Sequence, residues 1–258
     1  MPFDESTFDE LAQEVAFCLA NIRHPACTMK HAGRFYEDAA EALRAHAILR
    51  LLVDGNPDGF SNDLVMSGQA RRGWLRRCAR QGYADYFLAF SRSGSMLDAV
   101  AAGDLALAAE IFGLSPAEVR KGDEYPDDFW WQRFLGLLLA GAPAVALDAA
   151  LRALEAEVEG AGARLATARA LRARDAAAFD GAFRALLAER EAVNAEEAGR
   201  ALEEPALAVG AQVYVEGIAV LKLARHLGMD VEPEYPMCPG MALLPRPPAA
   251  PPDEFSGG

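Results

Sequence analysis

The chain has 258 residues, enough to bury a full hydrophobic core as one large domain or two small ones. Alanine and leucine dominate and β-branched residues are scarce, so the composition favours helix over sheet. The 38 acidic and 25 basic residues give a formal net charge of −13, which repels nucleic acids and anionic membranes and attracts basic partners, so neither a nucleic acid nor a membrane is expected to bind.

Three long helices are predicted in the N-terminal third of the chain. Thr7 and Glu10 have the spacing of a capping box, which marks the start of the first helix, and apolar residues then recur at helical intervals. Further helices are predicted at about 29–53 and 62–81. Gly82 follows the third helix at the position where helices often end, because glycine takes left-handed backbone angles without strain.

Shorter helices joined by glycine or proline breaks are predicted in the middle of the chain. Caps and breaks fix their limits better than apolar spacing does, since each helix is only a few turns long. The expected elements are two helical pieces within 98–112 hinged at Gly103 and Asp104, a short helix at 114–122 capped by Ser115, helices at 126–140 and 144–158, and a helical hairpin at 166–192 with Asp175 near its turn.

The most apolar stretch, residues 203–227, is predicted to be the central and most buried helix, because it is apolar nearly all round. It is long enough to span a membrane, but Gln212, Glu216 and Lys222 interrupt it, which favours a buried helix. A carboxylate inside such a helix needs a partner. We therefore expect Glu216 to pair with Arg225 or with an arginine of another helix.

Together these elements predict an all-α fold: an array of helical hairpins with tetratricopeptide-like, solenoid-style packing around the buried C-terminal helix, without a regular repeat. The expected organisation is a single all-α domain over residues 1–244, of which 1–60 could be a helical subdomain, and a Pro-rich disordered tail at 245–258. The N-terminus lacks the features of a signal peptide, and the four scattered cysteines do not suggest a disulfide framework. A cytoplasmic protein is expected.

No motif for covalent or metal chemistry stands out, whether a nucleophile elbow, a zinc-protease helix, a phosphate-binding loop or a dinucleotide-binding glycine pattern. His24, Cys27 and His31 could supply metal ligands, but their spacing matches no common zinc pattern. Cys238 follows His226 closely in sequence, yet it lacks the helix N-terminus that usually lowers a thiol pKa. We expect no enzymatic activity, no metal and no cofactor; an enzyme using Cys238 or a carboxylate pair is the weaker alternative.

Two loops combine acidic and aromatic residues: DEYPDDFWWQRFL at 123–135 and DVEPEYPMCP at 230–239. Such residues on proline-stiffened loops suit recognition of a basic protein surface, because little entropy is lost on binding; ordinary connecting loops are the alternative. A helical wheel for the first stretch places Trp130 and Trp131 on the core side and Phe129 opposite them. The candidate partner-binding residues are Asp123, Glu124, Tyr125, Asp127, Asp128, Phe129, Glu232, Glu234 and Tyr235.

Four stretches occur in this order along the chain: AAGDLALAAEIFGLSP, DEYPDDFWWQRFL, ALRARDAAAFDGAFRALLAER and EGIAVLKLARHLGMDVEPEYPMCP. Together they resemble the immunity protein 49 family, helical antitoxins of bacterial polymorphic-toxin and contact-dependent competition systems, over roughly residues 30–245. The resemblance implies a non-enzymatic protein that neutralises one cognate toxin by tight stoichiometric binding, and it brings no catalytic residues. We expect the toxin to be basic around its active site, so that an acidic surface steers association. A tetratricopeptide-like adaptor that neutralises no toxin is the alternative.

Overall fold

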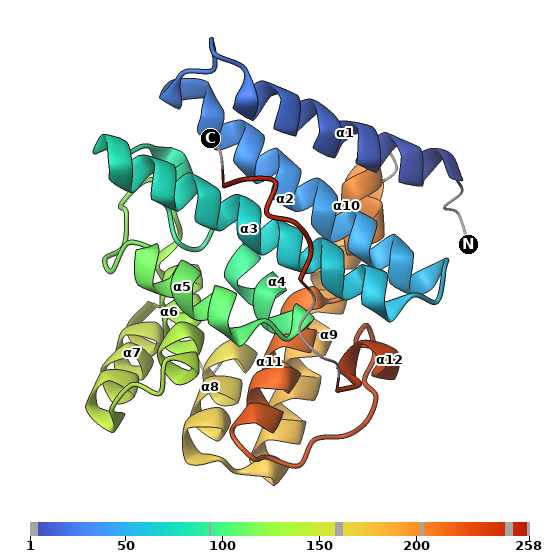
Figure 1. Ribbon diagram of the computed structural model, residues 1–258. Helices are drawn as coiled ribbons and strands as arrows, with labels where there is room; N and C mark the ends of the chain where they lie inside the picture. The colour runs from blue at the N-terminus through green and yellow to red at the C-terminus, as the bar shows by residue number, and fades with distance from the viewer. Residues whose placement is uncertain (1–4, 93, 158–161, 202–203, 246–249, 257–258) are drawn as a thin grey trace.

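The computed structural model describes the whole chain except residues 1–4, 93, 158–161, 202–203, 246–249 and 257–258 (Figure 1). Its described part is helical, with two isolated β-bridges and no β-sheet, so the predicted all-α fold is confirmed. The helices are α1 (Glu5–Arg23), α2 (Met29–Leu52), α3 (Pro57–Gln81), the 3-10 turn η1 (Tyr86–Leu88), α4 (Ser95–Ala102), α5 (Leu105–Leu114), α6 (Pro126–Leu139), α7 (Ala144–Glu157), α8 (Ala163–Ala173), α9 (Ala176–Ala201), α10 (Pro205–Gly210), α11 (Val215–His226) and α12 (Gly240–Leu243).

Helices that follow one another in sequence mostly pack against one another in space. In Figure 1, α1, α2 and α3 lie alongside each other, and α4 and α11 pack beneath them. Two further hairpins, α6 with α7 and α8 with α9, lie below the three long helices in Figure 1. The hairpin array is as predicted, and the described helices range from 4 residues in α12 to 26 in α9, so they share no fixed period.

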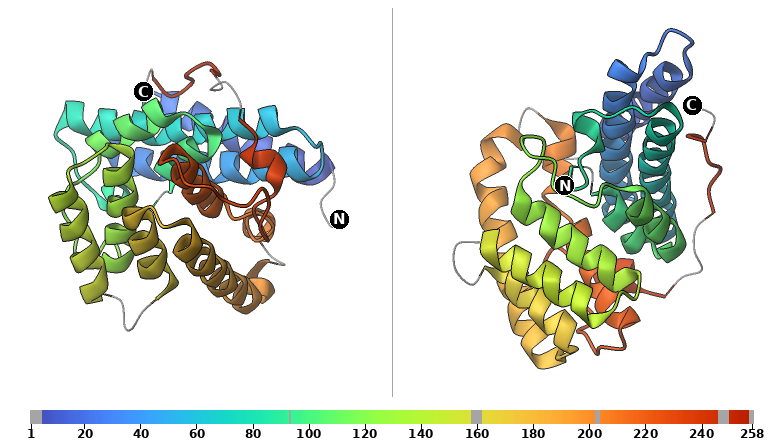
Figure 2. Two further views of the ribbon diagram at one scale, coloured as in Figure 1. Left: turned by 90° about the horizontal axis from the view of Figure 1, so that it is seen from below. Right: turned by 90° about the vertical axis from the view of Figure 1, so that its left-hand side faces the viewer.

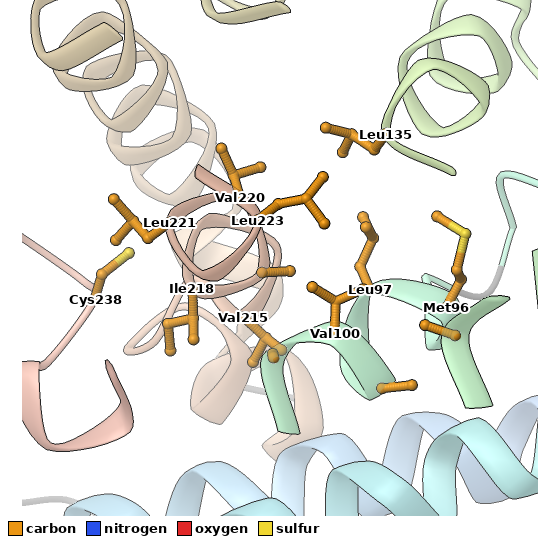
Figure 3. Close-up of a cluster of buried hydrophobic side chains, with 14 of the residues drawn as sticks. Met96, Leu97, Val100, Leu135, Val215, Ile218, Val220, Leu221, Leu223 and Cys238 are labelled. Atoms are coloured by element: carbon orange, nitrogen blue, oxygen red, sulfur yellow. The ribbon is translucent and has the colours of Figure 1, made fainter. Parts of the chain in front are cut away.

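The central core helix is α11, as predicted for this part of the chain. Its residues from Gly217 to Leu221 are all buried, which leaves no solvent-facing side over more than one turn. Figure 3 shows Val215 of α11 beside Val100 and Leu97 of α4. The core therefore forms where helices from both halves of the chain close around α11.

Residues 203–227 are not one helix, as the sequence suggested, because the chain leaves the helical path between α10 and α11. There the backbone N–H of Tyr214 donates to the carbonyl of Met237, at 2.8 Å, instead of extending the helical ladder. Among the described residues, Ala206–His226 is the stretch that meets a membrane-span criterion, with a mean hydropathy of 1.5. The break and the burial of α11 are consistent with a core segment of a soluble protein.

The prediction of a disordered tail is wrong for the part of it that the structure describes, residues 250–256. This segment crosses α3 (Figure 1, dark red), and Phe255 is 1% exposed, with its ring centroid 6.1 Å from that of Tyr36. Asp253 pairs with Arg72 of α3 at 2.6 Å. Phe255 is the only large apolar side chain in the tail, and the pocket that buries it comes from helices near the other end of the chain, so composition could not reveal it.

Two helix limits differ from those predicted by capping patterns. No separate helix forms at 114–122: Leu114 is the last residue of α5, and the Ser115 hydroxyl donates to the carbonyl of Ile111 at 2.8 Å and ends that helix. The first helix already includes Glu5, so Thr7 lies within it and does not cap it. A serine or threonine therefore does not reliably mark the start of a helix where its side chain can hydrogen-bond to a carbonyl of the preceding helical turn.

Candidate partner-binding site

The first acid–aromatic loop is folded onto its own neighbours. The Glu124 carboxylate accepts hydrogen bonds from the Ser91 N–H at 3.0 Å, the Ser91 hydroxyl at 2.7 Å and the Arg120 N–H at 2.9 Å. Asp123 pairs with Arg120 at 3.0 Å. Of the predicted contact residues in this loop, Tyr125 is the one that is widely open to solvent, at 76% exposed. Glu124 therefore closes the loop and does not project from it.

The start of α6 is tied to the helical hairpin of α8 and α9. Asp128 pairs with Arg164 at 2.5 Å, and Asp127 lies 4.0 Å from the same guanidinium. Burial raises the pKa of Asp128, and the charge of Arg164 partly offsets this effect. Phe129, predicted to face a partner, is fully buried and its ring lies 6.0 Å from that of Phe90. The wheel placed it wrongly because α6 packs against neighbours on more than one side.

The second acid–aromatic loop also turns its aromatic residue inward. Tyr235 is 4% exposed, donates its hydroxyl hydrogen to Asp180 of α9 at 2.9 Å and packs edge-to-face on Phe183. Its predicted role as an exposed contact is therefore wrong. Glu232 and Glu234 are exposed as expected. The two loops lie on different sides of the molecule in both views, so they do not form one surface (Figures 1 and 2).

A cleft of about 380 Å³ lies between α2, α4, α9 and the α10–α11 segment, and we call it the α2–α10 cleft. Figure 1 shows α10 alongside α2, although the two helices are far apart in sequence. The cleft has the size of a ligand-binding or side-chain-binding site, with apolar walls and a few convergent polar groups. Its charged and hydroxyl-bearing lining residues are Glu41, Arg44, Asp98, Arg190, Glu204, Tyr214 and Glu216.

The floor of the cleft is a buried ion pair between α2 and α4. Arg44 binds Asp98 through Nε at 2.7 Å and Nη2 at 2.8 Å, and Ser67 donates a third hydrogen bond to Asp98 at 2.6 Å. Burial lowers the pKa of Arg44, but the carboxylates of Asp98, Glu41 and Glu216 outweigh it and leave the pKa above its ordinary value. The Arg44–Asp98 pair therefore stays charged, and its hydrogen bonds fix its position in the cleft.

One wall of the cleft is formed by Glu216, for which Arg225 or an arginine of another helix was the predicted partner. Its carboxylate accepts from the Trp131 indole N–H at 2.7 Å and the Tyr214 hydroxyl at 2.8 Å, and it lies 3.9 Å from Arg164. The predicted arginine of another helix is thus Arg164, while Arg225 donates to the carbonyl of residue 243 instead. Burial and the charge of Glu216 raise the pKa of Tyr214 well above its ordinary value.

Glu41 and Arg190 are the charged groups most available to a ligand. Neither has a hydrogen-bonded or ion-paired partner among the described residues; Arg190 lies over the Tyr214 ring at 5.7 Å, and its Nε is buried without an acceptor. Desolvation by the cleft wall raises the pKa of Glu41, and the charge of Glu37 adds to the effect. Four carboxylates and two arginines line the cleft, so its field favours a cation.

The described residues offer little support for catalysis or metal binding. No group of three or more metal-ligating side chains occurs among them, so His24, Cys27 and His31 do not form a metal site there. Burial raises the pKa of Cys238 to about 12, which leaves its thiol protonated and unreactive near neutral pH. The chemistry that the cleft supports is charge recognition.

Sequence reasoning identified one residue of the cleft, Glu216. The other members come from segments between positions 41 and 215, and no short motif connects them. One signal was available: Asp98 is a carboxylate inside the apolar run that forms α4, which a buried partner would explain.

A family model described as immunity protein 49 matches residues 35–242, which is most of the chain. No curated protein and no solved structure matches it.

Proposed function

The chain belongs to the immunity protein 49 family, and from this membership we propose that it neutralises one cognate bacterial toxin by binding it directly and stoichiometrically. Family membership is the observation that carries the proposal. Neutralisation by binding needs no catalytic group, and burial keeps the Cys238 thiol protonated near neutral pH.

The α2–α10 cleft is our proposed contact region for a basic part of the toxin. Its carboxylates outnumber its arginines, and the whole chain carries a formal charge of −13. A field of this sign speeds the encounter with a cationic surface and favours one orientation of it. Tyr125, Glu232 and Glu234 remain proposed contacts outside the cleft, since they are exposed; Asp123, Glu124, Asp127 and Asp128 are engaged with Arg120, Ser91 and Arg164.

An adaptor in the manner of tetratricopeptide proteins is the alternative function. Such proteins bind extended peptides along a continuous concave surface built by regular repeats. Here the helix pairs share no period, and the α2–α10 cleft is a local cavity. The geometry therefore favours recognition of one protein surface over the gathering of several peptides.

Co-expression with the product of an adjacent gene, tested as the candidate toxin, tests the proposal. We expect the chain to restore growth to cells that make the toxin, and to co-purify with it in a complex of defined stoichiometry by light scattering. Toxin made together with a chain carrying an unrelated point change on α7, Glu155→Gln, should be neutralised equally well. Failure of both rescue and complex formation would refute the proposed function.

A further inference from the structure

A second cavity, of about 430 Å³, lies where the end of α1, the loop at 24–28 and the start of α2 meet the turn η1. We call it the α1–α2 pocket. It is separate from the α2–α10 cleft, and most of it precedes residue 35, where the family match begins. Toxin binding by the rest of the chain therefore does not account for it.

The floor of the α1–α2 pocket is aromatic and held in place. A Cβ atom at Gly33 would lie 2.7 Å from Phe87 Cδ2, so the glycine lets the Phe87 ring lie directly on α2. Arg71 and Trp74 donate to the carbonyl of Phe87, at 2.5 and 3.2 Å, and fix its backbone. Phe35 forms the other part of the floor. A fixed, partly exposed aromatic floor is suited to an apolar group.

The apolar surface continues beyond the pocket itself. Phe17 of α1 is 57% exposed and meets Phe35 edge-to-face, with ring centroids 6.0 Å apart. A large aromatic side chain this open to water gains little for the fold, whereas burial by a ligand would stabilise the bound state. The floor and its edge can thus cover an apolar body larger than a methyl or phenyl group.

The rim of the pocket is basic in a chain that is strongly acidic overall. His24, Lys30, His31 and Arg34 line it, and no Asp or Glu does. Lys30 has no ion-pair partner among the described residues, and the Arg34 side chain is 74% exposed although it lies 3.3 Å from Asp38. Lys30 and His31 also stand in the first turn of α2, where no acid is present and Thr28 provides no side-chain cap.

The two basic residues in the first turn of α2 are unfavourable for the stability of that helix. Anions stabilise the first turn of a helix through the macrodipole, and cations there do the reverse. Positions that break a local rule without a gain for the fold are often functional. A bound anion would supply the missing negative charge to the helix end and to Lys30 together.

We propose that the α1–α2 pocket binds a small amphiphilic carboxylate, such as a medium-chain or aromatic acid. Its apolar body covers Phe35 and Phe87, and its carboxylate lies between Lys30 and Arg34 at the rim. The pocket thereby selects against cationic and uncharged amphiphiles of the same length, since neither can pair with the basic rim.

Cys27 provides a direct reporter, because it lines the pocket and is partly exposed. The other three cysteines are buried, and burial raises the pKa of each thiol to about 12. Neutral iodoacetamide should therefore alkylate Cys27 alone, as checked by peptide mass spectrometry. We expect decanoate, kept below its micelle concentration, to slow this alkylation at least tenfold, and decyltrimethylammonium and decanol to leave it unchanged.

The variant Lys30→Gln/Arg34→Gln removes the two rim cations proposed to bind the carboxylate, and neither side chain is buried. We expect it to weaken protection by decanoate roughly tenfold or more, the loss anticipated when hydrogen bonds to a charged group are removed. Lys121→Gln, at an exposed lysine outside the pocket, is the matched control and should protect like the wild type. Absence of protection by decanoate, or equal protection by the cationic amphiphile, would overturn the proposal. Neither result depends on toxin binding.

Discussion

Arg44 and Asp98 form a two-point ion pair at 2.7 and 2.8 Å that joins α2 to α4 beneath the α2–α10 cleft. The Asp98 side chain is 2% exposed, and that of Arg44 is 28% exposed. A carboxylate buried to this degree must be paired, because an isolated charge in a protein interior carries a large desolvation cost. The pair therefore fixes the relative position of two cleft walls as well as the charge of the floor.

Removing Asp98 should destabilise the fold more than removing an exposed partner does. We expect Asp98→Ala to lower the free energy of unfolding by about 3–5 kcal/mol, because it leaves the Arg44 guanidinium without its buried partner. Asp148→Ala, which breaks a pair with Arg172 in which the Asp148 side chain is 46% exposed, should cost no more than about 1 kcal/mol. Urea denaturation measures both. Equal losses of unfolding free energy would show that the buried pair stabilises the fold no more than the exposed pair does.

Trp131 should stabilise the fold through the hydrogen bond of its indole N–H as well as through the burial of its ring. It is fully buried and donates to Glu216, whereas Trp130, also predicted to be core, is only partly buried. We expect Trp131→Phe to lower the free energy of unfolding by about 1–3 kcal/mol, since Glu216 then loses a buried donor. Trp130→Phe, measured by the same thermal or urea unfolding, should cost less. The reverse order would contradict the assigned hydrogen bond.

The C-terminal segment should contribute to the stability of the N-terminal helices. Phe255→Ala removes a buried aromatic ring from its contact with Tyr36, and we expect the free energy of unfolding to fall by about 3–5 kcal/mol. Glu254→Ala removes only a partly exposed pair with Arg23 and should change the free energy of unfolding by no more than about 1 kcal/mol. If Phe255→Ala unfolds like the wild type, the segment does not pack on α3 in solution.

The charge of Glu41 should reduce stability near neutral pH. Its pKa is raised on folding, so the folded chain binds this proton more tightly than the unfolded chain, and the free energy of unfolding falls as pH rises through the folded pKa. We therefore expect Glu41→Gln to have a higher Tm than the wild type at pH 7. The difference should disappear below the ordinary pKa of 4.5, where Glu41 is protonated in both states. A lower Tm for the variant at pH 7 would contradict the assigned environment.

Neutralising the cleft should slow association with the toxin. The double variant Glu41→Gln/Glu204→Gln removes two charges from the cleft, and we expect its association rate to fall several-fold and to depend less on salt concentration. Glu118→Gln/Glu155→Gln removes the same charge from exposed positions outside the cleft and serves as the control. Stopped-flow or surface-based kinetics distinguish the two. Equal effects of both variants would place the toxin contact elsewhere, while leaving the proposed function intact.

Local signals predicted most of the fold. Gly82 and Gly103 end α3 and α4 with φ of 60° and 91°, and Asp104 caps α5 through a 2.9 Å bond to the Leu107 N–H, as their positions in sequence suggested. Each of these features depends on residues within one helical turn. The break between α10 and α11 could not be predicted in this way, because it depends on a hydrogen bond to the carbonyl of Met237, which is distant in sequence.

The candidate site was harder to predict, because its geometry depends on partners far away in sequence. Glu124 turns inward to Ser91, 33 positions earlier, and Tyr235 turns inward to Asp180, 55 positions earlier. An acidic or aromatic residue in a Pro-rich loop has the same sequence pattern whether it faces solvent or a distant donor. The position of a carboxylate inside an apolar run was the available sequence signal; it identified Glu216 and would also have identified Asp98.

The contact between Phe255 and Tyr36 links the packing of the first helices to the timing of synthesis. Ribosomes add roughly 5–20 residues per second, so Phe255 follows Trp74, which belongs to the same aromatic cluster, by ~10–35 s. Until then α1, α2 and α3 can assemble, but the gap that Phe255 fills between Tyr36 and Gly73 stays open to water or to other nascent chains. The aromatic cluster of a newly made copy is therefore completed late in synthesis. Faster translation of the segment after α11 would shorten the time for which this cluster is exposed, and slower translation would lengthen it.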